Sequence, residues 1–93
     1  YHSKKEAAYA AELVLREKAG DILSWQRQIP IDLVVNGYKI CRYYVDFVVA
    51  FHNGDAELVE VKGFETEVYR LKRKLLEATY LKENPDVRYV VVK

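Results

Sequence analysis

The chain has 93 residues, of which 51% are hydrophobic and 31% charged, and this balance predicts one globular domain over residues 1–93 rather than a disordered segment. Its longest apolar runs, at residues 48–51 and 90–92, are far shorter than the ~20 residues that span a bilayer, so we expect no membrane segment. The net charge of +1 argues against nucleic-acid binding through bulk charge, so any such binding must rest on local clusters of cations.

The first predicted element is a helix from about Lys4 to Lys18. Ser3 and Glu6 fit a capping box, the alanines that follow favour helix, and Gly20 is typical of a helix end.

Two strand-like segments follow, at residues 29–35 and 38–51, both rich in valine, isoleucine and tyrosine. The dipeptide Asn36-Gly37 between them tolerates positive φ at both turn positions, which predicts a tight hairpin. Pro30 should lie near the start of the first strand, where its missing N–H does least harm.

A second turn at residues 52–54 leads into a third strand at 56–62, and residues 87–92 form the last strand. Between them, residues 66–82 have apolar side chains at helical spacing, which we expect to face the sheet: Val68, Leu71, Leu75 and Ala78. A strand, a helix and a strand in this order predict a right-handed crossover, with the last two strands parallel. The fold class is therefore α/β, with the order α-β-β-β-α-β around a mixed sheet.

Asp46 lies in an otherwise apolar strand, residues 43–49, where an unpaired carboxylate would cost several kcal/mol. It therefore needs a metal, a cation, an opening to solvent or, as a structural alternative, hydrogen bonds to backbone amides at a bulge. Glu60 and Lys62 end the next strand on one face, either as part of a ligand site or as an exposed ion pair of little consequence.

The turn decides whether Asp46 and Glu60 share a face. A three-residue loop at 52–54, with Gly54 in the left-handed position, pairs Phe51 with Asp55 and places Asp46 opposite Glu60, whereas a two-residue loop would point Asp46 to the other side. We expect the three-residue loop. Two adjacent carboxylates with a lysine one pleat further suit a hard cation such as Mg²⁺.

Asp46, then Glu60-Val61-Lys62 at the end of the next strand, in this element order and with a glutamate on the leading helix, resembles the PD-(D/E)XK nuclease superfamily, whose core is the restriction-endonuclease-like fold. The resemblance covers almost the whole chain and is closest to phage-encoded Holliday-junction-resolvase-like nucleases. Val45 stands where the superfamily pattern has proline, a position that the superfamily varies freely. The stretches that carry the narrower resemblance are Ser3 to Ala7, Gln28, Val45 to Phe47, Lys62 to Glu67, Tyr69 and Leu71 to Lys74.

The resemblance implies a role for each matching residue. Asp46, Glu60 and the backbone carbonyl of Val61 would bind Mg²⁺, for which Mn²⁺ can substitute, and Lys62 would stabilise charge on the scissile phosphate. Glu6 would complete the metal site from the first helix, its structural alternative being the capping box alone. Two polar residues, Gln28 and Thr66, would contact the ligands rather than the metal, although Gln28 also fits plain polarity at a strand edge.

The same resemblance assigns DNA binding to a set of cations on the two helices: Lys4, Lys5, Arg70, Lys72, Arg73 and Lys74. On a helical wheel Lys72 falls on the sheet-facing side, either as a snorkelling lysine or reaching toward DNA phosphate near Lys62. Arg70, Arg73 and Lys74 should point outward, as a solvated face or as a DNA contact.

The single cysteine, Cys41, excludes an internal disulfide, and with His2 and His52 it offers too few ligands for a tetrahedral zinc site, so we expect an intracellular setting, the cytoplasm of a host cell if the protein is phage-encoded. Both histidines are expected at the surface. The chain starts at Tyr1 without an apolar leader, which predicts that it belongs to a slightly longer polypeptide.

The leading hypothesis is a Mg²⁺-dependent endonuclease that cuts branched DNA, above all four-way junctions, as a two-fold symmetric homodimer with no membrane partner. The alternatives are a monomeric nuclease that nicks other branched or single-stranded DNA, a catalytically inactive DNA-binding module of the same fold, and a small structural domain with surface ion pairs.

Overall fold

The computed structural model describes residues 3–93, so the expected surface position of His2 lies outside the described residues. Helix α1 spans Lys4–Lys18, as predicted, and the Glu6 amide donates to the Ser3 hydroxyl at 3.1 Å. None of the helices within residues 3–93 has the length and apolar character to cross a membrane.

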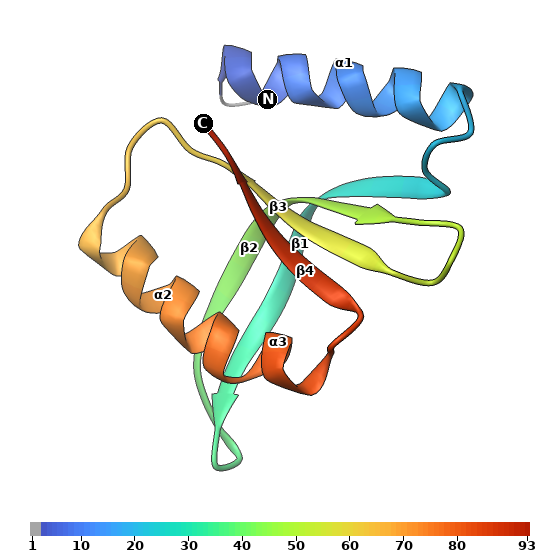
Figure 1. Ribbon diagram of the computed structural model, residues 1–93. Coiled ribbons are helices and arrows are strands. Elements are labelled where there is room, and N and C mark those ends of the chain that lie inside the picture. The colour runs from blue at the N-terminus through green and yellow to red at the C-terminus, as the bar shows by residue number, and fades with distance from the viewer. Residues whose placement is uncertain (1–2) are drawn as a thin grey trace.

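Four strands form a single mixed sheet in the order β1-β2-β3-β4 within residues 3–93 (Figure 1). The strands β1, β2 and β3 pair antiparallel, and β3 and β4 pair parallel, as the crossover predicts. Their bounds are β1 Ser24–Val35, β2 Tyr38–Ala50, β3 Ala56–Val61 and β4 Val87–Val92. The predicted α/β class and the α-β-β-β-α-β order are confirmed, with the second helical segment divided in two.

The expectation for Pro30 is wrong, because β1 begins at Ser24 and Pro30 lies within the strand, opposite Tyr44. The strand tolerates a residue without an N–H because β1 is at the edge of the sheet, where one side of the backbone needs no strand partner.

Each face of the sheet carries its own core. Helix α1 covers one face, and α2 (Glu67–Ala78) with α3 (Tyr80–Glu83) covers the other (Figure 1). The α1 core is built from Ala10, Leu13, Ile22, Phe47, Val49, Val59 and Val61. The α2 core is built from Ile31, Leu33, Tyr43, Val45, Leu58, Tyr69 and Leu76.

The β1–β2 hairpin changes faces at Asp46. Phe47 packs in the α1 core and Val45 in the α2 core, although residues two apart in a regular strand point to the same side. On the paired strand the backbone is irregular at the same level, since Gln28 has a positive φ of 54°. Asp46 therefore lies where the hairpin passes from one core to the other.

The predicted helix at residues 66–82 is broken at Thr79, whose backbone leaves the helical region and whose hydroxyl donates to the Leu75 carbonyl at 2.6 Å. Its predicted apolar face is right for Leu75, which packs against the α2 core, and wrong for Val68, Leu71 and Ala78, which are exposed. Tyr69 and Leu76 are buried instead. The sheet-facing side is built from tyrosine, leucine and the stems of long cations, a composition that apolar periodicity alone does not recognise.

Candidate active site

The loop between β2 and β3 sets the position of the two acidic residues. The Phe51 amide donates to the Asp55 carbonyl at 2.9 Å, and Gly54 has a φ of 95°, so the predicted three-residue loop is confirmed. The β2–β3 pairing runs from Ala50–Ala56 to Phe47–Val59, so Asp46 and Glu60 lie just beyond its last pair.

Asp46 is held by hydrogen bonds to the neighbouring strands. Its Oδ2 accepts from the Val61 amide at 2.8 Å, and its Oδ1 accepts from Gln28 Nε2 at 3.4 Å. The structural alternative for Asp46, a carboxylate that accepts from a backbone amide, is therefore observed in the bond from Val61. Each carboxylate oxygen can accept more than one bond, and the Val61 carbonyl points to the same side of β3 as its amide, so oxygen atoms gather at this position.

Glu60 is the most unusual group of the site, since only 3% of the residue is exposed. Its Oε2 accepts from the Tyr43 hydroxyl at 3.0 Å, and its Oε1 lies 3.4 Å from Lys62 Nζ. Burial, and next the charge of Asp46, raise the pKa of Glu60, while Tyr43 and Lys62 act in the opposite direction. With the Lys62 side chain only 27% exposed, this pair is not the exposed ion pair of the structural alternative.

A chain of tyrosine hydroxyls continues from Glu60 into the α2 core. Tyr43 lies 2.8 Å from Tyr89, and Tyr89 lies 2.6 Å from Tyr69, between hydroxyl oxygens. Burial is the main cause that raises the pKa of both Tyr43 and Tyr89, so these hydroxyls keep their protons. Lys62 Nζ lies 4.3 Å from the centre of the Tyr69 ring.

The sequence interpretation missed these three tyrosines. They come from β2, α2 and β4, and only the parallel register, which sets Tyr89 beside Leu58, aligns them with Glu60. The sequence does place one tyrosine on each of three elements that are predicted to pack together, and this pattern could have indicated a cluster of hydroxyl groups.

Glu6 is buried in the first turn of α1, where its amide donates to the hydroxyl of Ser3, the residue that caps the helix. This turn lies beside the end of β3, because Lys5 Nζ is 3.8 Å from the position that a Cβ on Gly63 would take. No group of three or more histidine, cysteine, aspartate or glutamate side chains within residues 3–93 is close enough to hold a metal ion. The structure therefore brings Asp46 and Glu60 together but does not join Glu6 to them, and a metal role for Glu6 stays a prediction.

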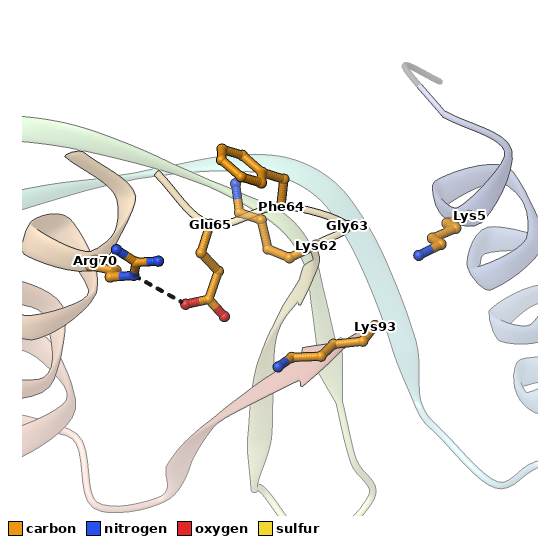
Figure 2. Close-up of a pocket in the computed structure, with 7 residues that line it drawn as sticks. All are labelled: Lys5, Lys62, Gly63, Phe64, Glu65, Arg70 and Lys93. Atoms are coloured by element: carbon orange, nitrogen blue, oxygen red, sulfur yellow. Dashed lines mark ion pairs between the residues drawn. The ribbon is translucent and has the colours of Figure 1, made fainter. Parts of the chain in front are cut away.

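Lys62 separates two hollows. One, of about 260 Å³, is lined by Glu60, Lys62, Thr66 and Lys72 among others. The other, of about 380 Å³, is lined by Lys62, Phe64 and several cations (Figure 2). A ligand that meets Lys62 can therefore extend to either side of it.

The predicted cations take three different positions. Lys72 is half-buried beside Glu60 and donates to the Arg42 carbonyl at 3.4 Å, while Lys5 and Arg70 line the larger hollow and Lys4 and Lys74 are exposed. Arg73 points outward only in part, since its side chain is 37% exposed. Its guanidinium lies 5.0 Å from the centre of the Tyr89 ring and 3.3 Å from Glu77, because the buried tyrosines offer it a cation–π contact.

Thr66, expected to contact the site's ligands, caps α2 instead of binding an acidic residue. Its hydroxyl accepts from the Tyr69 amide at 3.1 Å while the residue lines the smaller hollow. Thr66 thereby fixes the start of the helix that carries Tyr69.

The donor atoms fit a hard divalent cation. Two carboxylates and a backbone carbonyl are oxygen ligands of the kind that Mg²⁺ prefers, and Mg²⁺ is commonly held by one or two carboxylates, with water and substrate oxygens completing its shell. A cation here would also offset the burial and the repulsion from Asp46 that raise the pKa of Glu60.

Comparison with known proteins gives one match. Neither a search of curated proteins nor a search of solved structures returns a similar protein. A family model described as "Protein of unknown function (DUF1064)" matches residues 1–92, so the chain belongs to this family.

Proposed function

We propose that this protein is a Mg²⁺-dependent, structure-selective DNA endonuclease that hydrolyses phosphodiesters in branched DNA, above all in four-way junctions. One observation carries the proposal: Asp46 and Glu60 lie just beyond the last β2–β3 pair on adjacent strands, and Lys62 Nζ lies 3.4 Å from Glu60. A buried glutamate with a half-buried aspartate and a lysine beside it has little structural benefit, because two neighbouring carboxylates repel each other, and it has a clear use in binding a cation and a phosphate.

Asp46, Glu60 and the Val61 carbonyl would hold Mg²⁺, or Mn²⁺ in its place, with Glu6 approaching from α1. When bound, the cation would supply Lewis-acid stabilisation of phosphate charge and a lowered pKa of coordinated water. Lys62 lies between the two hollows and donates to a non-bridging phosphate oxygen, which stabilises the negative charge that develops during hydrolysis. Tyr43 and Gln28 hold the two carboxylates in place through their hydrogen bonds.

Resolution of a four-way junction needs two paired incisions, which a two-fold homodimer provides and a single site does not. We therefore propose a homodimer that acts on DNA inside the cell, without a membrane partner. The cations Lys4, Lys5, Arg70, Lys72 and Lys74 contact the DNA backbone in this proposal, whereas Arg73 acts mainly by packing on Tyr89.

The test is a cleavage assay with Mg²⁺ on a synthetic four-way junction, a linear duplex of the same sequence and a single strand. Cleavage of the junction alone, lost in Asp46→Asn without loss of junction binding, is the expected result. Cleavage of the single strand by a monomer supports the alternative of a monomeric nuclease, and junction binding without any cleavage supports the inactive DNA-binding module. If Asp46→Asn cuts at the wild-type rate, the site assignment is wrong.

A further inference from the structure

The larger hollow beside Lys62 gathers cations from four parts of the chain. Lys5 comes from α1 and Arg70 from α2, whereas Lys62 directly follows β3 and Lys93 directly follows β4 (Figure 2). Among residues 3–93, Glu65 is the one carboxylate in its lining, and it lies 3.7 Å from Arg70. Four cations and one carboxylate give this hollow a formal charge of +3, or +2 with Glu60, the ion-pair partner of Lys62, in a chain whose total is only +1.

Regular structure places three of these cations. The Lys62 amide donates to the Val92 carbonyl at 2.9 Å. The parallel pairing of β3 with β4 therefore brings Lys62 and Lys93 to the same end of the sheet. Lys5 is held by α1 and reaches across Gly63. Because like charges brought together in this way repel, the arrangement favours an anion between them, and phosphate is an anion that both lysine and arginine bind.

Phe64 stands at the same hollow with 79% of its surface exposed. A large apolar ring left in water beside cations is typical of single-stranded nucleic-acid sites, where bases stack on aromatic side chains while the backbone follows positive charge. A base in an intact duplex is already stacked on both sides, so only an unpaired or splayed base can use Phe64.

We propose that this hollow binds one nucleotide unit of the DNA next to the scissile phosphate. The cations take the adjacent backbone phosphate, and Phe64 stacks on an unpaired base. The volume of about 380 Å³ lies within the range of small-ligand sites, and Lys62 lines this hollow as well as the one that contains Glu60. The inference rests on the proposed function for its ligand, and it explains why branched DNA, which has unstacked bases at the branch, is preferred over linear duplex.

The experiment measures binding in EDTA, where metal-dependent cleavage does not occur. The ligands are a branched oligonucleotide with an unpaired 2-aminopurine at the branch point and a linear duplex with the same base paired. Wild type should bind the branched ligand about tenfold more tightly, with a change in 2-aminopurine fluorescence from stacking. Phe64→Leu should bring the affinity ratio close to 1 and remove the fluorescence change.

Lys93→Gln should weaken binding of both ligands and lower the salt dependence of the affinity by about one ion. The matched controls are Tyr38→Leu, which removes another exposed aromatic ring at the far end of the β1–β2 hairpin, and Lys18→Gln, which removes a lysine at the other end of α1. Both should bind like wild type.

Unchanged selectivity in Phe64→Leu, or an equal loss in Tyr38→Leu, would overturn the proposal. So would adenosine monophosphate that binds as tightly as the branched ligand, since the hollow would then be a site for free nucleotides. Because these measurements need no cleavage, selective binding that depends on Phe64 in a protein that never cuts DNA would retain this inference and reject the nuclease. Cleavage of branched DNA by a protein whose binding selectivity does not depend on Phe64 would reject this inference and retain the nuclease.

Discussion

Replacement of Tyr43 by phenylalanine tests whether the tyrosine chain controls Glu60. The change removes one hydroxyl that lies 3.0 Å from the Glu60 carboxylate and 2.8 Å from the Tyr89 hydroxyl, and leaves the ring in the α2 core. Tyr89 keeps its contact with Tyr69, and Glu60 keeps its ion pair with Lys62.

Hydrogen bonds to charged groups contribute about 1.5–3 kcal/mol, and here the bond is to a buried carboxylate, so Tyr43→Phe should lower the free energy of unfolding by about 2–3 kcal/mol. For a chain of this length that corresponds to a fall of roughly 10–20 °C in Tm. Tyr38→Phe, which removes a hydroxyl from an exposed tyrosine, should cost less than about 0.5 kcal/mol.

The effect should depend on pH in a defined direction. The pKa of Glu60 is raised by burial above its usual 4.5, so its contribution to folding stability is full below that value and is lost as the pH rises through the folded-state pKa. The Tyr43 hydroxyl stabilises the ionised form, so its removal raises this pKa further. The stability difference between wild type and Tyr43→Phe should therefore be larger at pH 8 than at pH 4.

Urea titrations of wild type, Tyr43→Phe and Tyr38→Phe at pH 4, 6 and 8, with EDTA present, measure both quantities. The slope with urea should stay constant, which shows that compactness is unchanged. A loss below about 0.5 kcal/mol at pH 8, or a loss that is equal at all three pH values, would refute the role assigned to the Tyr43–Glu60 bond.

Three further predictions concern the site. Glu60→Gln should remove the loss of stability that wild type shows as the pH rises above about 4.5, and Mg²⁺ should raise the Tm of wild type but not of this variant, both measured by thermal denaturation. Lys62→Ala should lower the saturated cleavage rate by about 100-fold with only a modest change in junction affinity, whereas Lys74→Ala should weaken binding and leave that rate unchanged, which single-turnover kinetics separates. Gln28→Val should cost about 2 kcal/mol in urea unfolding, because a β-branched residue tolerates a positive φ poorly, while Gln28→Gly should stay within about 1 kcal/mol of wild type.

Features coded by neighbouring residues were predictable. Ser3, Glu6 and Gly20 mark both ends of α1, and Gly54 with its neighbours forms the predicted three-residue loop between β2 and β3. In each case the physical cause, a cap or a positive φ, lies within a few residues of its effect.

Features that depend on packing between distant elements were not predictable in the same way. Tyr69 and Arg73 turn toward the sheet because Tyr89 lies there. The spacing of apolar residues had predicted Val68 and Leu71 on that side of the helix, where both are in fact exposed. The prediction started β1 near Pro30 rather than at Ser24, because proline usually marks the boundary of a strand. Proline is tolerated within β1 because this strand lies at the edge of the sheet.

The change of faces at Asp46 links the fold to the site. If the pairing of Phe47 with Val59 continued regularly, Val45 would lie opposite Val61 and the backbone of β2 would supply its hydrogen-bond partners. Val45 instead packs into the α2 core, and the Val61 amide bonds to the Asp46 side chain at 2.8 Å. The change of faces that buries Val45 therefore also brings the Asp46 carboxylate to the end of β3, where Glu60 and the Val61 carbonyl lie. The cluster of oxygen atoms is a consequence of two cores on opposite faces sharing one hairpin.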